Sequence, residues 1–187
     1  MRTTDKHNLH VVTIDGTDAA ERRRSLARAD GGLNLELIHG VRYRPARPVT
    51  HEMGNLTEIA RTTWDEVDVP IAQIHITSTF PDGIVAWGVH LQQVDRLFVA
   101  SGAVRFVCYD ARQDSPTHGL INEIYVSDRT PALIVIPTGV YHGWKNIGGT
   151  ESIIVSMPSE NYNFESPDTL QLRWDDPATR EIIPYSW

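Results

Sequence analysis

The chain has 187 residues, enough for one domain with a sizeable core, and its 17 Lys and Arg against 24 Asp and Glu give a formal charge of −7. This acidic balance argues against a general nucleic-acid-binding protein. The single cysteine, Cys108, excludes an internal disulfide, and no apolar run approaches the roughly 20 residues of a membrane span. Because the amino-terminal residues also lack an apolar signal segment, we expect a cytoplasmic protein that contacts no membrane.

The first residues of the chain differ in character from the rest. Asp18 is a candidate helix N-cap, alanines and arginines follow it, and Gly31-Gly32 marks a stop. We therefore predict an amino-terminal extension, residues 1–36, that contains a short helix and precedes a second region, residues 37–187.

From about residue 37 the sequence consists of short runs rich in β-branched and aromatic residues, such as AQIHITSTF, DRLFVASGAVRFVCYD and ALIVIP. Gly, Pro, Asp and Ser separate these runs, and such spacing predicts an all-β sandwich or barrel. Gly102 in ASGAV predicts a tight hairpin turn. The last segment is loop-rich and aromatic, and we expect it to wrap over the barrel or to pair with another subunit.

Two stretches carry the candidate chemistry. In VIPTGVYHGWKN, residues 135–146, Pro137 and Gly139 predict a tight turn, and His142 begins the next strand. In GVHLQQVDRLFVASG, residues 88–102, His90 and Gln92 are two residues apart, which predicts that they share one face of a strand.

Together the two stretches resemble the paired motifs of the cupin superfamily, an antiparallel β-barrel or jelly roll whose mouth holds the active site. The second motif matches as Pro137-x-Gly139-x-x-His142-x-x-x-Asn146. The first has Gln92 where metal-binding cupins have a second histidine, and Asp95 lies one residue before the usual acid. We therefore expect no metal and no cofactor; the open alternative is a metal cupin whose ligands would be His90, Gln92, Asp95 and His142.

A narrower resemblance rests on GVH (88–90), YDARQDSPTHG (109–119), IPTGVYHGW (136–144) and LRWDDP (172–177). These segments look like the dTDP-4-dehydrorhamnose 3,5-epimerase family over about residues 38–177. The resemblance implies a metal-independent reaction in which the histidine at position 90 removes protons beside the ketone of a nucleotide-linked sugar. An imidazole, with an ordinary pKa of about 6.5, suits that role. It also implies a homodimer, because family members commonly exchange amino-terminal strands.

Several family positions hold other residues here. Trp87 and Met53 stand where the family has arginines that help to hold anionic substrate groups. The family's catalytic tyrosine falls on Ile154 or Val155, and no carboxyl-terminal aspartate is identified as the partner of the histidine. Two other tyrosines, Tyr141 and Tyr162, are therefore the candidate acids.

We predict His90 as the catalytic base and Tyr141 or Tyr162 as the acid. Aromatic and polar groups often line the mouth of a barrel, and the residues expected to bind substrate are Trp87, Gln92, Arg96, His142 and Trp144. A local ion pair between Asp95 and Arg96 and purely structural roles for the histidines are the competing interpretations.

The favoured function is proton transfer beside a carbonyl, an epimerisation or isomerisation of a sugar nucleotide. Three alternatives stay open. The first is a cyclase or isomerase of natural-product biosynthesis that acts on a more apolar, polyketide-like substrate, since Trp87 and Met53 replace arginines. The second is the metal-dependent cupin. The third is a barrel that binds a small molecule without catalysis.

Overall fold

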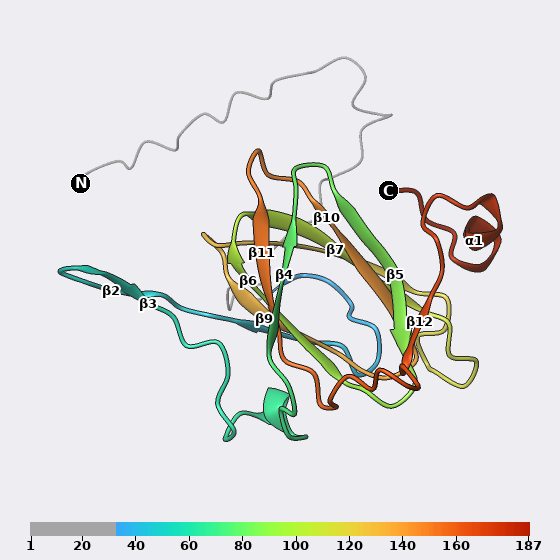
Figure 1. Ribbon diagram of the computed structural model, residues 1–187, viewed down its shortest axis with the longest axis horizontal. Coiled ribbons are helices and arrows are strands. Elements are labelled where there is room, and N and C mark those ends of the chain that lie inside the picture. The colour runs from blue at the N-terminus through green and yellow to red at the C-terminus, as the bar shows by residue number, and fades with distance from the viewer. Residues whose placement is uncertain (1–32) are drawn as a thin grey trace, which may run out of the picture. The chain divides into compact units, whose positions relative to one another are not determined.

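The computed structural model describes residues 33–187 (Figure 1). The helix predicted after Asp18, and with it nearly all of the extension predicted over residues 1–36, lies outside the described residues. No helix within the described part of the chain is long and apolar enough to cross a membrane.

The described chain is built mainly from antiparallel strands, which confirms the predicted all-β, cupin-type jelly roll. The strands are β1 (Arg42–Pro45), β2 (Val49–His51), β3 (Gly54–Leu56), β4 (His75–Thr79), β5 (Ile84–His90), β6 (Asp95–Ser101), β7 (Ala103–Asp110), β8 (Ile121–Ser127), β9 (Ala132–Ile136), β10 (Val140–Asn146), β11 (Ser152–Ser156) and β12 (Thr169–Gln171). A 3-10 turn, η2 (Asp65–Val67), and a short helix, α1 (Pro177–Ile182), complete the described structure.

Two five-stranded sheets face each other. The first has the order β1-β9-β6-β11-β4, and the second has the order β12-β5-β10-β7-β8. Strands β4 and β12 lie at the outer ends of these orders, and β2 and β3 form a separate hairpin that extends away from the sheets (Figure 1).

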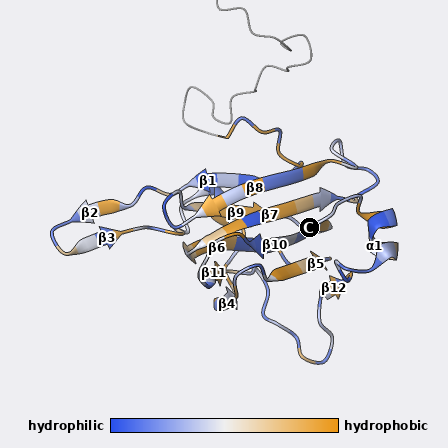
Figure 2. Ribbon diagram, turned by 90° about the horizontal axis from the view of Figure 1, so that it is seen from above, coloured by the Kyte–Doolittle hydropathy of each residue, from blue (hydrophilic) through white to orange (hydrophobic). Residues whose placement is uncertain are grey.

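The core lies between the sheets. Side chains alternate between the two faces of a strand, and Val104, Phe106 and Cys108 of β7 are fully buried. Strand β9, which reads ALIVI, is buried along its whole length and is uniformly hydrophobic (Figure 2). Such a strand needs cover on both faces, and the segment before β4 supplies part of that cover through Ala46 and Ile59.

The carboxyl-terminal segment covers the outer face of the second sheet. Trp187 and Tyr185 pack against Trp87 with ring centroids 4.9 and 5.8 Å away, and Ile183 is fully buried in the same cluster. The aromatic side chains at the carboxyl-terminal end therefore pack on the face of the sheet that points away from the barrel interior.

Gly102 and Gly139 are among the described glycines whose backbone conformation other residues rarely take. Gly102 has φ +83° in the turn between β6 and β7, as ASGAV predicts, and Gly139 has φ +77° in the turn before β10. The backbone N–H of Gly139 donates to the carbonyl of His90 at 2.7 Å. The turn of the second motif therefore joins the end of β5 and brings the two motif histidines to the same end of the barrel.

Candidate active site

A cavity of about 300 Å³ lies between the two sheets. Strands β4, β6 and β11 of the first sheet line one wall, and β5, β10 and β12 of the second sheet line the other. The size suits a single sugar ring or a comparable small group.

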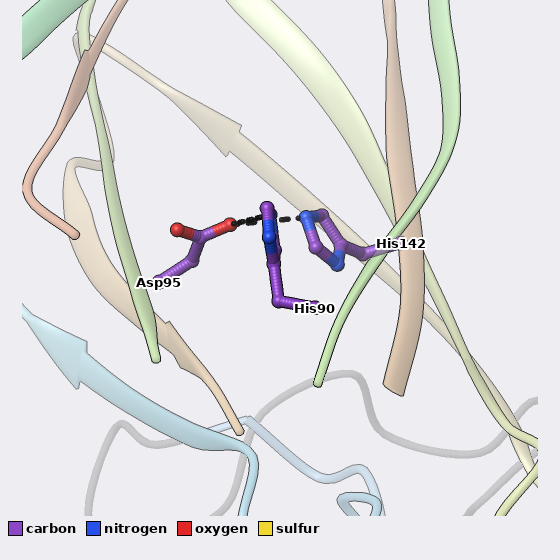
Figure 3. A group of neighbouring side chains, drawn as sticks. All are labelled: His90, Asp95 and His142. Carbon is purple, nitrogen blue, oxygen red and sulfur yellow. Dashed lines mark ion pairs between the residues drawn. The ribbon is translucent and has the colours of Figure 1, made fainter. Parts of the chain in front are cut away.

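Three buried polar side chains meet in this cavity. Asp95, from β6, places its Oδ2 atom 3.2 Å from Nε2 of His90 and 3.2 Å from Nε2 of His142 (Figure 3). The two imidazoles come from β5 and β10 of the opposite sheet, with ring centroids 5.6 Å apart. One carboxylate thus holds both histidines in place from across the barrel.

A second carboxylate contacts the other side of the His90 ring. Oδ2 of Asp168 lies 3.6 Å from Nδ1 of His90, and the hydroxyl of Thr169 lies 3.4 Å from the same nitrogen. Asp168 also accepts hydrogen bonds from the backbone N–H groups of Leu91, Gln92 and Gln93 at 3.0 to 3.2 Å. The turn after β5 therefore fixes Asp168, and Asp168 orients the imidazole.

These carboxylates set the charge of the site. Burial works to lower the pKa of His90, but the hydrogen bond and the charge of Asp95, with a contribution from Asp168, outweigh burial and raise it above its ordinary value. Burial works to raise the pKa of Asp95, but its hydrogen bonds to His142 and His90 hold it well below its ordinary value. Asp95 is therefore a carboxylate at neutral pH, and His90 is a stronger base than a free imidazole.

The same three groups fit a divalent transition metal. The ligand atoms of His90, Asp95 and His142 all lie within 4.8 Å of one another, and two imidazoles with one carboxylate are a common donor set for such ions. A bound metal would supply a Lewis acid for a carbonyl oxygen. It would also occupy Nε2 of His90, so metal binding and base catalysis compete for one nitrogen.

The basic side chains of the described cavity wall are those of three histidines, His75, His90 and His142. Neither lysine nor arginine lines it, and Asp168 with Glu160 lines an adjoining hollow. Apolar contact comes from Val85, Leu97 and Trp144. The described wall therefore offers a bound group histidines and apolar side chains, but no lysine or arginine.

Four of the predicted site residues lie at the cavity, namely His90, His142, Trp144 and Tyr162. Trp144 is held by a hydrogen bond of 2.9 Å from its Nε1 to the hydroxyl of Thr79. Tyr162 lies on the loop after β11, is 49 % exposed, and packs edge-on against Phe164.

Three predicted site residues lie elsewhere, so the structure corrects the expectation that they face the cavity. Trp87 and Tyr141 pack in the cluster on the outer face of the second sheet. Arg96 is fully buried and donates to the carbonyls of Glu66, Val69 and Met157. Its ion pair is with Asp68, at 3.9 Å, and not with the neighbouring Asp95.

The first motif also needs a correction. Strand β5 ends at His90, and the chain bends at residues 91 and 92, so Gln92 is exposed and does not share the face of His90. Gln93 takes that place: its amide lies 3.3 Å from Nε2 of His90 and donates to Asp95 at 2.6 Å. A metal site in the described chain would therefore exclude Gln92 from the ligands named above.

The structure also places the residues that stand at family positions, and it brings two residues to the site that the sequence did not predict. Met53 is 86 % exposed on the β2–β3 hairpin, and Ile154 is fully buried inside the barrel. Sequence reasoning missed Asp168, since it lies 78 positions after His90 in a loop-rich segment, and it assigned no role to His75, which lines the cavity from β4. The alternation of His75, Thr77 and Thr79 with Ile74 and Ile76 was the available signal for His75.

A jelly-roll barrel whose mouth holds a histidine between two carboxylates belongs to the class of acid–base enzymes on a cupin-type scaffold. Residues 38–182 match the dTDP-4-dehydrorhamnose 3,5-epimerase family, so the chain belongs to that family and is an epimerase-type enzyme.

Two named relatives are similar to this chain over most of their length. The chain is 32 % identical over 139 residues to the probable low-salt glycan biosynthesis epimerase Agl13 of Haloferax volcanii. The matched region covers 74 % of this chain and 89 % of the relative. The chain is 30 % identical to the spore coat polysaccharide biosynthesis protein SpsL of Bacillus subtilis, over 81 % of this chain and 97 % of that one. A solved dTDP sugar isomerase from Desulfovibrio desulfuricans shares the fold, with a TM-score of 0.73 at 22 % identity over 80 % of this chain and 92 % of that chain.

Proposed function

We propose that the protein epimerises or isomerises a keto sugar carried on a nucleotide, with His90 as a metal-independent base that removes a proton from the carbon beside the carbonyl. The observation that carries this proposal is the buried His90 at the cavity, with Asp168 3.6 Å from its Nδ1 atom. Family membership supports the substrate class, because the matched family is described as acting on dTDP-4-dehydrorhamnose.

The geometry suits proton removal at carbon. A carbonyl acidifies the neighbouring C–H bond, because the resulting negative charge is delocalised onto oxygen. Nε2 of His90 lies beside the cavity-lining Asp95 and Gln93, whereas Nδ1 faces Asp168. We propose that Nε2 takes the proton after the substrate displaces its contact with Asp95, and that Asp168 stabilises the imidazolium that forms.

The cavity accepts the sugar and leaves the nucleotide outside. Its volume of about 300 Å³ holds one ring, and its described wall carries no lysine or arginine to pair with a diphosphate. Of the two predicted acids, Tyr162 lines this cavity and Tyr141 lies on the outer face of the sheet. In this proposal the reacting ring is enclosed and the charged diphosphate remains near solvent.

The test is hydrogen exchange. The protein is incubated in deuterated water with 4-keto-6-deoxyglucose linked to thymidine diphosphate, and separately with the uridine and guanosine diphosphate forms. We expect deuterium at a carbon beside the ketone, seen by NMR and mass spectrometry. Absence of deuterium in every substrate refutes the proposal.

A second candidate is an isomerase or cyclase acting on a less charged, natural-product-like substrate. Trp87 and Met53 do not support it, because neither residue lies at the cavity. The absence of lysine and arginine from the described cavity wall is the observation that still favours it. A competition experiment distinguishes the two functions. If the protein acts on a nucleotide-linked sugar, thymidine diphosphate slows turnover of a poor substrate by competing for the site. If it acts on a less charged substrate, thymidine diphosphate leaves the rate unchanged.

We also propose a cytoplasmic homodimer. Support comes from the β2–β3 hairpin, which extends from the barrel with Val49, Met53 and Leu56 exposed by 57 to 86 %, and from the edge strand β4, where Ile76 is 67 % exposed (Figure 1). Apolar surface of this kind favours a protein partner. Light scattering on wild type and Met53→Asp tests it: we expect a dimer that the substitution weakens, and a wild-type monomer refutes it.

A further inference from the structure

Inversion of a carbon centre requires two groups, because the proton must return to the face opposite the one from which it left. His90 and His142 both project from the second sheet, and both contact Asp95 through Nε2. They therefore approach a bound ring from the same side. The returning proton must come from the first sheet or from the cavity mouth.

The first sheet offers few proton carriers to the cavity. Its polar residues there are His75, Thr77, Asp95 and Ser156. Asp95 is set aside because its carboxylate is occupied: Oδ2 lies 3.2 Å from Nε2 of both His90 and His142, and Oδ1 accepts from Gln93 at 2.6 Å. Aliphatic hydroxyls are very weak acids, which sets Thr77 and Ser156 aside. An imidazole changes charge between pH 5 and 8 and is the suitable donor of this set.

The position of His75 follows from strand alternation. Ile76 of β4 and Ile74, which directly precedes β4, are 67 and 65 % exposed, whereas the alternating residues His75 and Thr77 line the cavity. Within the described chain, the His75 imidazole makes no hydrogen bond or ion pair, which leaves it available to a substrate. The His75 side chain is exposed in the described chain, which lets it exchange protons with water.

We propose that His75 is the second catalytic residue of the proposed epimerisation, delivering a proton to carbon on the face opposite His90. This assignment rests on the proposed function. In the step, the C–H bond breaks and its proton moves to Nε2 of His90, leaving an enolate. The imidazolium of His75 then gives its proton to the same carbon, a new C–H bond forms, and the carbonyl is restored. Water later removes the proton from His90 and returns one to His75.

Tyr162 is the competing donor. It reaches the cavity from the loop that also contains Asn161 and Asn163, and it lines the adjoining hollow with Gln93 and Asp168. Those two residues contact His90. Tyr162 therefore lies near the base, and its backbone N–H also donates to Oε1 of Gln73, two residues before His75, so the Tyr162→Phe variant is needed to decide between the two donors.

The experiment separates proton removal from inversion. Wild type, His75→Gln, His75→Asn and Tyr162→Phe react in deuterated water with the 4-keto-6-deoxyglucose of thymidine diphosphate, and NMR records deuterium uptake and the epimer separately. His118→Gln is the matched control, since His118 is an exposed histidine in the loop before β8 and outside the cavity. Thermal melting confirms that each variant is folded.

For both His75 variants we expect deuterium uptake within about tenfold of wild type but epimer formation lower by about 100-fold or more, the usual effect of losing a general acid. Wild-type epimer formation in a folded His75 variant overturns the assignment. The assignment is also overturned if the His75 variants lose both deuterium uptake and epimer formation. The same holds if Tyr162→Phe, and not the His75 variants, takes up deuterium without forming the epimer. A wild type that takes up no deuterium refutes the proposed function itself and removes the assignment with it.

Discussion

Replacing Asp168 by asparagine is the most informative single change at the His90 ring. The substitution removes the charge 3.6 Å from Nδ1 of His90 and keeps one of the two oxygens, which can still accept from Gln92 and Gln93, while the bond from Leu91 to the other oxygen is lost. At that distance the attraction between carboxylate and imidazolium is about 1 kcal/mol in water and about 5 kcal/mol at an effective dielectric constant of about 20. Because the side chain of Asp168 is 20 % exposed, the true value lies between these limits.

The predicted consequence is a slower and pH-shifted reaction. Each 1.4 kcal/mol or so is a factor of ten, so we expect kcat/KM to fall by about 10-fold to about 1,000-fold. In wild type, kcat/KM rises with pH as His90 loses its proton at its raised pKa. Since the carboxylate contributes to raising that pKa, Asp168→Asn moves this rise to lower pH.

Initial rates from pH 5 to 9, roughly the range over which histidines titrate, provide the assay. The matched control is Asp128→Asn, which likewise removes a carboxylate that accepts a backbone N–H, from Gly102 at 3.0 Å, in a turn outside the cavity. Unchanged rate and pH profile in Asp168→Asn would refute the pairing of Asp168 with a catalytic His90.

Two further predictions concern stability and metal. Asp110→Ala should lower the free energy of unfolding, measured by urea titration, by about 2 to 4 kcal/mol, because this fully buried carboxylate accepts from Arg112, Ser115 and Thr117 and its loss leaves those donors unpaired. These bonds hold the pKa of Asp110 below its usual 3.8, so its contribution to stability is present above that pH and declines as the pH falls further. Equal stability of the variant and wild type at pH 7 contradicts the prediction. Removing metal with a chelator should leave the activity intact, whereas added zinc should inhibit by occupying Nε2 of His90 in the His90, Asp95 and His142 group; activity that disappears with the chelator and returns with metal contradicts the metal-independent mechanism.

The sequence predicts the barrel and the two motif histidines well, since their signals are local. The proline and glycine of the second motif dictate a turn, and Gly139 in that turn bonds the carbonyl of His90. Strand alternation, applied from His90 and His142, already directs Trp87 and Tyr141 to the outer face, where the structure has them. Their assignment to the cavity neglected that rule.

The remaining site residues depend on contacts that no local pattern contains. Gln93 replaces Gln92 because β5 ends at His90 and the chain bends there. Asp168 reaches His90 only because β12 pairs with β5, which brings Thr169 opposite His90. Arg96 is buried by a segment some 30 residues earlier in the chain, through the carbonyls of Glu66 and Val69.

The central claim is that His90 removes a proton from carbon beside a carbonyl. Single-turnover incubation of His90→Gln and wild type with the thymidine diphosphate-linked 4-keto sugar in deuterated water measures that step directly. We predict deuterium at the carbon beside the ketone with wild type and a rate lower by about 100-fold or more with folded His90→Gln. Equal deuterium uptake by the two proteins would contradict the claim.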